Sequence, residues 1–219
     1  MKTYKLILGL SIALLCSQSA MSQKDTTEPK LGKGYFSISP IHFISNGLKL
    51  EYNVPLKNGN LFYISPEFYS GKLGLVDSGR VTGIGVNTGI KYVFSHIQKR
   101  QEHSVNYFAV GVEGNYFNVE SAGNIWVSKV VNNQSVLIQE RRPVNRQYTR
   151  LGMQVLFGTM RYDESRFFYE LAAGAALRHS INRFTDGYQP TEIEDQFPWS
   201  YGWSGISPLI YFKLGVVLR

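Results

Sequence analysis

Residues 167–178 read FFYELAAGAALR, and their side chains alternate between two kinds of residue. The first kind is mostly large and apolar or aromatic, and its members are Phe167, Tyr169, Leu171, Ala173, Ala175 and Leu177. The second kind mixes small residues with isolated charges, and its members are Glu170, Ala172, Gly174, Ala176 and Arg178. Because successive side chains of a β-strand point to opposite faces of its sheet, this period of two predicts a strand with two unlike faces.

The same alternation recurs along most of the chain from Gly34 onward, between turn residues. It predicts eight strands, at about residues 34–43, 47–56, 60–71, 82–95, 104–121, 147–162, 166–182 and 205–219. Asn46-Gly47 and Asn58-Gly59 are predicted hairpin turns, because Asn and Gly accept the positive φ that tight hairpins need. A third tight turn is expected at residues 163–165. No apolar run of about eighteen residues follows Gly34, so we expect no transmembrane helix.

The face that is not apolar decides between a soluble barrel and a transmembrane barrel. A solvated face would be crowded with Lys, Glu, Ser and Thr, whereas this face consists largely of Gly and Ala with a few long charged residues. That mixture suits the narrow lumen of a closed transmembrane β-barrel of about eight strands. Placing this face inward collects cations and carboxylates in near balance, at Lys49, Lys91, Arg150, Arg178 and Lys213 and at Glu51, Glu67, Glu113 and Glu170.

We interpret these charged residues as an ion-paired network that fills the lumen, because buried charges need partners in a low dielectric. The four carboxylates alone would also suit an acid–base cluster. The cations beside them favour ion pairing over such a catalytic role.

The first 22 residues have the features of an export signal. Lys2 and Lys5 precede an apolar segment at residues 6–15, and small residues stand before an expected cleavage site at Gln23. Cys16 is the only cysteine, and Leu15 before it does not suit a lipoprotein signal. We therefore expect a signal peptide at residues 1–22, a polar leader at 23–33 and a barrel domain at 34–219.

Loop lengths agree with export to an outer membrane. With the leader on the periplasmic side, the connections at residues 57–59, 96–103 and 163–165 lie on that side and are short. The connections at 72–81, 122–146 and 183–204 lie on the other side and are long, as in outer-membrane barrels. Residues 125–131 and 135–138 alternate around Asn132-Asn133, which predicts that the fifth and sixth strands continue as a protruding hairpin.

These features resemble small outer-membrane barrels of the OmpA/OmpX type, and they are similar to uncharacterised outer-membrane barrels of Bacteroidota. The resemblance covers about residues 34–219 and rests on architecture. It implies a location in the bacterial cell outer membrane, with outer-membrane lipid around the barrel.

Motifs for chemistry are largely missing from the sequence. HExxH, CxxC, GxSxG and the GKS/GKT end of a phosphate-binding loop are absent. Related barrels that remove acyl chains from lipid A carry His and Ser two residues apart on one face. Here His179 and Ser180 are adjacent, so they face opposite sides of a strand, and His42 and Ser45 are also opposed. His96 and His103 fall in a predicted turn. We predict no catalytic, cofactor-binding or metal-binding residue.

The last long loop is acidic and rich in aromatic residues. Its rings are candidates for surface recognition or for anchoring at the membrane interface, and they are Tyr188, Phe197, Trp199, Tyr201 and Trp203. An equal alternative is that this acidic loop pairs with Arg141, Arg142 and Arg146 on the neighbouring hairpin. The formal net charge is +7, but Lys and Arg are scattered, so no nucleic-acid partner is expected.

The sequence thus favours a non-enzymatic outer-membrane barrel with a structural or surface-recognition role. Its expected contacts are outer-membrane lipid and, through the long loops, another envelope protein. The alternatives are a lipid-modifying outer-membrane enzyme and a narrow channel for small solutes.

Overall fold

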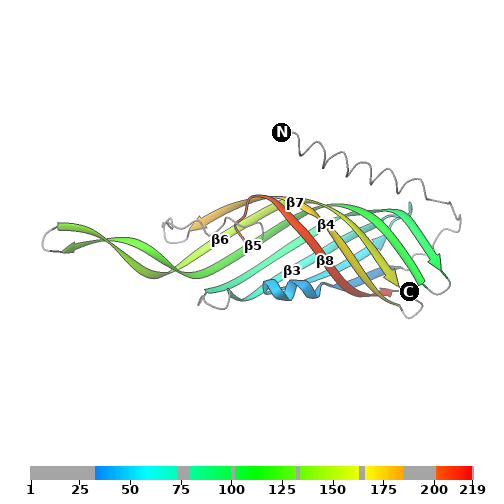
Figure 1. The fold of residues 1–219 in the computed structure, drawn as a ribbon, viewed down its shortest axis with the longest axis horizontal. Helices are drawn as coiled ribbons and strands as arrows, with labels where there is room; N and C mark the ends of the chain where they lie inside the picture. The colour runs from blue at the N-terminus through cyan, green and yellow to red at the C-terminus, as the bar shows by residue number, and fades with distance from the viewer. Residues whose placement is uncertain are drawn as a thin grey trace, which may run out of the picture. The chain divides into compact units, whose positions relative to one another are not determined.

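A computed structural model of the chain describes residues 33–73, 79–99, 102–131, 134–162, 166–184 and 201–218. They form a closed barrel of eight strands, in which each strand pairs with the next and β8 also pairs with β1 (Figure 1). Every pairing is antiparallel, and the strands are β1 (Gly34–Ile38), β2 (Gly47–Pro55), β3 (Leu61–Leu73), β4 (Gly79–Lys99), β5 (Glu102–Val131), β6 (Gln134–Tyr162), β7 (Phe167–Phe184) and β8 (Gly205–Leu218). The predicted all-β closed barrel of eight strands is confirmed.

Several predictions fall on parts of the chain that are not described. The expected signal peptide, almost all of the leader, and the loop residues Tyr188, Phe197 and Trp199 lie outside the described residues. Within the described part of the chain, none of the helical structure has the length and apolar character to cross a membrane.

The first strand is shorter than predicted. β1 ends at Ile38, and residues predicted as strand up to position 43 instead enter a 3-10 helix, η1 (Pro40–Ser45). Pro40 starts this helix because its fixed φ suits the first helical turn and it has no N–H to donate. Asn46 ends the helix at φ 56°, and its N–H donates to His42 O and Phe43 O. Asn46-Gly47 is therefore a helix cap followed by a strand start, so the predicted two-residue hairpin turn is wrong.

The predicted turn at residues 96–103 is also wrong. β4 runs on to Lys99 and β5 begins at Glu102, so His96 and His103 lie in paired strands. A β-bulge between Val93 and Ser95 shifts the register there. The two imidazole rings stack with centroids 5.8 Å apart, and the His103 ring stacks on Tyr162 at 4.9 Å.

The strands β5 and β6 extend far past their other neighbours (Figure 1). β4 reaches only Glu120 on β5, and β7 reaches only Arg146 on β6, whereas β5 and β6 pair with each other as far as Val131 and Gln134. Residues 121–131 and 134–145 therefore form a two-stranded ribbon, and the predicted protruding hairpin is confirmed. We call this end of the barrel the ribbon end, and the end with Gly34 and Leu218 the terminus end.

The two predicted faces of the strands separate as expected. Outward-facing apolar side chains are exposed, with Ile84 at 62%, Leu177 at 62% and Ile210 at 69%. Ala176, Leu209 and Tyr211, which adjoin Leu177 and Ile210 in sequence, point into the lumen and are buried. The alternation in the sequence therefore assigned the inner and outer faces correctly.

Side chains fill the lumen in layers. At the terminus end, the buried core consists of Tyr35, Leu61, Val105, Met160 and Phe168. Toward the middle it consists of Tyr63, Tyr107, Ala109, Leu156, Ala172, Ala176, Leu209 and Tyr211. At the ribbon end it consists of Tyr69, Val81, Phe117, Val119 and Tyr148, with Tyr201 packed against them.

Inward-facing glycines make room for these large side chains. Tyr63 reaches across the lumen from β3, and its hydroxyl lies where a Cβ on Gly111 would stand. Gly114, on the outward face of the same strand, has room for a Cβ, which would make an ordinary van der Waals contact with Leu151 Cδ2 at 3.6 Å. Gly111 is thus required by packing, whereas Gly114 is not.

We expect Gly111→Ala to lower the free energy of unfolding by about 1–3 kcal/mol, the usual cost of an overpacked interior. Gly114→Ala, the matched control, is expected to be neutral or slightly stabilising. Chemical unfolding in detergent micelles measures both. In a Tyr63→Phe background, Gly111→Ala should cost less, because the hydroxyl is gone. Equal effects of the two alanines would contradict this account.

Candidate functional site

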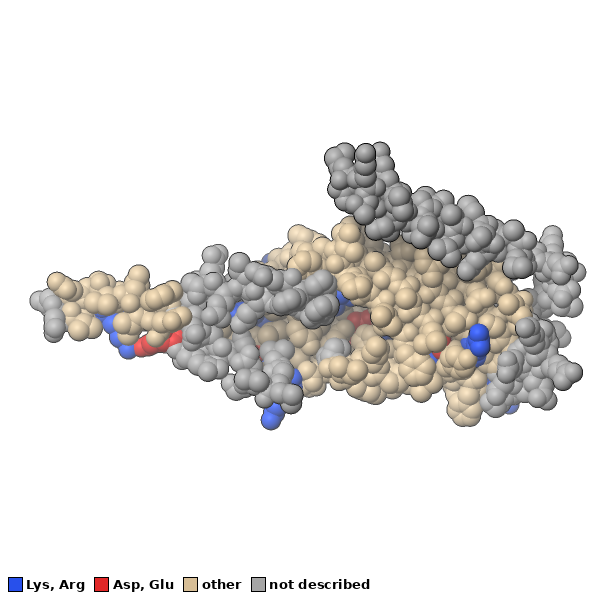
Figure 2. All heavy atoms as spheres, viewed as in Figure 1, with Lys and Arg blue, Asp and Glu red and all other residues tan. Residues whose placement is uncertain are grey.

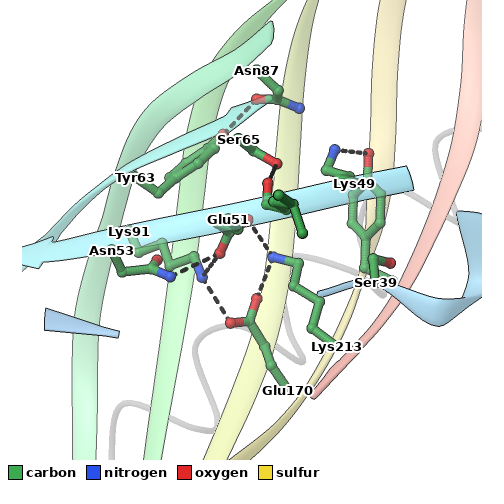
Figure 3. Close-up of polar contacts among 12 residues, drawn as sticks. Ser39, Lys49, Glu51, Asn53, Tyr63, Ser65, Asn87, Lys91, Glu170 and Lys213 are labelled. Carbon is green, nitrogen blue, oxygen red and sulfur yellow. Dashed lines mark hydrogen bonds and ion pairs between the residues drawn. The ribbon is translucent and has the colours of Figure 1, made fainter. Parts of the chain in front are cut away.

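The centre of the lumen holds a closed ring of alternating charges, drawn in Figure 3. Lys91 Nζ lies 2.7 Å from Glu51 Oε1 and 2.8 Å from Glu170 Oε2. Lys213 Nζ lies 2.6 Å from Glu51 Oε2 and 2.7 Å from Glu170 Oε1. Each lysine thus bridges both carboxylates, and all four carboxylate oxygens accept from an ammonium group. We call these four residues the central ring.

Two kinds of contact assemble the central ring. Glu170 and Lys213 are directly opposite each other in the β7–β8 register, so they form a cross-strand pair. Lys91 belongs to β4, which does not neighbour β2, β7 or β8, and its ammonium reaches Glu51 and Glu170 across the lumen. The ring therefore ties opposite walls of the barrel together.

Hydrogen bonds and aromatic rings complete the surroundings of the central ring. Tyr107 Oη donates to Glu170 Oε1 at 2.6 Å, and Asn53 Nδ2 donates to Glu51 Oε1 at 3.0 Å. Lys91 Nζ lies 4.8 Å from the centre of the Tyr107 ring. Buried charges are tolerated only when paired and hydrogen-bonded in this way.

A second ion pair lies nearer the ribbon end. Lys49 and Glu67 are opposite each other in the β2–β3 register, and Lys49 Nζ lies 2.6 Å from Glu67 Oε1. Tyr69 Oη donates to the other carboxylate oxygen of Glu67 at 2.7 Å. The Lys49 ammonium also lies 4.5 Å from the centre of the Tyr211 ring.

The third group contains two arginines and one carboxylate. Arg178 Nε donates to Glu113 Oε1, and Arg178 Nη2 donates to Glu113 Oε2 at 3.2 Å. Gly152 stands between Glu113 and Arg178 in the register, and a Cβ there would lie 2.9 Å from Glu113 Cγ. Because Gly152 has no side chain, the side chains of Glu113 and Arg178 can meet above it. Arg150 Nε is 3.9 Å from Glu113 Oε1.

The structure places all nine charged residues predicted for the lumen inside it, in these three groups. Arg178 and Arg150 lie beside Glu113, whereas Glu170 pairs with Lys91 and Lys213. The strand tilt and stagger set which side chains meet across a closed barrel, and alternation carries no information on them.

Sequence reasoning missed several polar residues that link the layers. Gln154 Nε2 donates to Tyr63 Oη at 2.8 Å and to Asn87 Oδ1 at 3.0 Å. These polar residues occupy the same alternate positions along their strands as the inward-facing charged residues. That position in the alternation is the sequence feature from which they could have been predicted to face the lumen. Arg146, assigned to the base of the protruding hairpin, is only 4% exposed and lies on the inward-facing side of β6.

His179 and Ser180 face opposite sides of β7 as predicted, whereas His42 and Ser45 do not lie in a strand. His179 is exposed, whereas Ser180 bonds to the segment before β8 through Trp203 O at 3.0 Å. His42 lies in η1 and not in a strand, and its Nδ1 is 3.2 Å from Ser39 Oγ. Ser39 Oγ itself donates to Phe212 O at 3.1 Å and is buried.

Two residues of the predicted aromatic loop are described, and both pack at the ribbon end of the lumen. The Tyr201 ring lies 4.8 Å from the Phe117 ring and 6.3 Å from the Tyr69 ring. The Trp203 indole lies against Gly205, with Cζ2 3.1 Å from the Cβ position there. Tyr201 and Trp203 therefore cover the lumen from its ribbon end.

No group of three or more His, Cys, Asp or Glu side chains within the described ranges is arranged to hold a metal ion. Comparison of the chain with protein-family models, curated proteins and solved structures gives no match. The function proposed for the chain therefore rests on the geometry of the lumen and of the outer surface.

The central ring should behave as one coupled unit. Glu170→Gln is expected to cost about 3–5 kcal/mol of unfolding free energy, because it leaves buried lysines short of negative charge. Combining it with Lys213→Met should cost less than the sum of the single changes, by about 0.5–3 kcal/mol. Chemical unfolding of the singles and the double in detergent micelles measures this coupling.

The matched control combines Glu170→Gln with Arg178→Gln, since these two residues share no ion-pair partner among the described residues. That pair should be additive within about 0.5 kcal/mol. Additivity of Glu170→Gln with Lys213→Met would show that the ring residues are solvated separately.

Proposed function

We propose that this chain is a non-enzymatic outer-membrane β-barrel with a closed lumen, and that its ribbon serves in surface recognition. The observation that carries the proposal is the inverted distribution of polarity. Apolar side chains cover the outside of the barrel, whereas ion pairs and hydrogen-bonded groups lie inside. On the face drawn in Figure 2, most of the described barrel surface is free of Lys, Arg, Asp and Glu.

The height of the apolar surface supports a membrane location. Outward residues 167–177 of β7 are uniformly apolar or aromatic over ten residue steps. At about 3.4 Å per residue this run is roughly 34 Å long. A strand tilt near 45° reduces it to roughly 25 Å, the height of the apolar band on outer-membrane barrels. A soluble protein rarely exposes so large a continuous apolar surface.

The filled lumen argues against a channel. The central ring crosses it, and the buried apolar layer at the terminus end lies beneath that ring. An eight-stranded barrel has an interior just wide enough for its side chains. The geometry therefore favours a role that needs no passage through the barrel.

The ribbon supports a role in recognition. Among the described residues, no third strand pairs with residues 121–131 or 134–145, so both long edges of the ribbon present backbone groups without a strand partner in that part of the chain. It is roughly 37 Å long at 3.4 Å per residue. One of its faces exposes Trp126 at 50%, Val130 at 74% and Leu137 at 65%. Exposed edges and apolar side chains of this kind are used to bind extended partner segments.

Cysteine labelling on intact cells tests the location and the orientation together. We expect Ser128→Cys, on the ribbon, to react with a membrane-impermeant maleimide on intact cells. Lys57→Cys, in the exposed turn between β2 and β3, should react only after the outer membrane is permeabilised. Labelling of both positions on intact cells, or recovery of the protein in the soluble fraction, would contradict the proposal.

A charge on the outward face tests contact with lipid. Leu171→Lys should impair folding into phospholipid vesicles, at a cost of about 2–4 kcal/mol for a lysine near the bilayer midplane. Ser128→Lys, which adds the same charge on the exposed ribbon, should fold as well as the parent protein. The gel shift between folded and heat-denatured protein measures both. Normal folding of Leu171→Lys would favour a soluble barrel.

A further inference from the structure

The three charged groups of the lumen differ in their balance. The central ring has two lysines and two glutamates, and Lys49 is matched by Glu67. In the third group, the guanidinium of Arg178 donates hydrogen bonds to both carboxylate oxygens of Glu113. Arg150 Nε is 3.9 Å from that carboxylate, beyond hydrogen-bond distance. This group therefore has one more cation than carboxylate.

Arg150 is buried with few hydrogen bonds. It is 6% exposed, and its guanidinium lies 4.9 Å from the centre of the Phe117 ring. Nη2 donates to Asn115 Oδ1 at 3.2 Å when the Asn115 amide is oriented to satisfy both of its atoms. Among the described residues, Nε has no hydrogen-bond acceptor. A guanidinium has five N–H donors, and a buried charge left so poorly paired is costly.

A second donor without an acceptor lies in the same region. Trp203 Nε1 is buried and has no hydrogen-bond partner among the described residues. Arg150 pairs with Ser180 in the β6–β7 register, and Ser180 Oγ donates to Trp203 O at 3.0 Å. The main chain of Trp203 therefore lies beside Ser180, which is the residue opposite Arg150 on the neighbouring strand. The indole lies at Gly205, which is directly opposite Arg178.

We propose that the ribbon end of the lumen binds a small free oxyanion, such as a phosphate or carboxylate group, between Arg150 and Trp203. The anion supplies the missing negative charge and accepts from the two unpartnered donors. Guanidinium groups bind such oxyanions well because their N–H groups match the spacing of the oxygens. Arg178 adds positive charge, and its side chain remains 11% exposed.

The proposed site is closed on the side of the terminus end, which favours binding of a ligand over its transport through the barrel. Below it, the central ring and the apolar layer of Tyr35, Leu61, Val105, Met160 and Phe168 fill the lumen. A ligand therefore enters from the ribbon end, past Tyr201 and Trp203. Binding at this site does not depend on the recognition role of the ribbon.

Fluorescence of Trp203 reports on the site directly. The full barrel in detergent micelles, with Trp126→Phe and Trp199→Phe, leaves Trp203 as the remaining tryptophan. Sodium phosphate and sodium acetate are titrated at constant ionic strength, with chloride as the replaced anion. We expect a saturable change in Trp203 fluorescence with at least one of them. Arg150→Gln should weaken the apparent affinity at least tenfold.

Arg183→Gln removes an exposed arginine of β7 and serves as the matched control, with unchanged affinity expected. Should Arg150→Gln fail to fold, Arg150→Lys keeps the charge but removes Nε, and it should also bind more weakly. A phosphate-dependent rise in the thermal midpoint, present in the parent and absent in the Arg150 variant, is the second readout. No response beyond chloride, or equal affinity in the Arg150 variant, would overturn the proposal.

Discussion

Pairing of charges inside a narrow closed barrel is the constraint on which the rest of this structure depends. Eight strands leave an interior only as wide as the side chains that point into it. Lys91, Lys213, Glu51 and Glu170 are therefore held away from water, where each charge must find a partner. The central ring meets this need by sharing two ammonium groups between two carboxylates. Because Lys91 comes from the wall opposite β7 and β8, the same contacts join the two sides of the barrel.

Glycines and large inward side chains are complementary in this interior. Tyr63 extends over Gly111, and Glu113 lies against Gly152, so each long polar group occupies the space that a small residue leaves. The small residues on the inward face are thus part of the charge network, because they allow Glu113 and Arg178 to meet across Gly152. The interior is a packed core that contains ion pairs, and the ribbon extends from two of the strands that enclose it.

The ribbon and the barrel differ in what stabilises them. Each strand of the barrel has two neighbours and an interior to pack against, whereas an isolated two-stranded hairpin is only marginally stable in water. The ribbon continues the register of β5 and β6, and an ion pair between Lys129 and Glu140 crosses it. Its root in the barrel therefore supplies order to a segment that exposes edges and apolar side chains for contact.

Alternation along the chain was enough to establish which side chains face inward, because a strand has a period of two and the pattern in residues 167–178 recurs in most of the other strands. It therefore predicted the closed all-β fold, the protruding hairpin and the set of nine charged lumen residues. Only the closed barrel decided which of those charges pair. Glu170 meets lysines of β4 and β8 because the tilt and stagger of the strands determine which side chains lie at the same level along the barrel axis. The helical turn at residues 40–45 and the stacking of His96 and His103 within strands also emerged only in three dimensions. Pro40 starts that helical turn and a β-bulge precedes His96, and the alternation from which the strands were predicted signals neither feature.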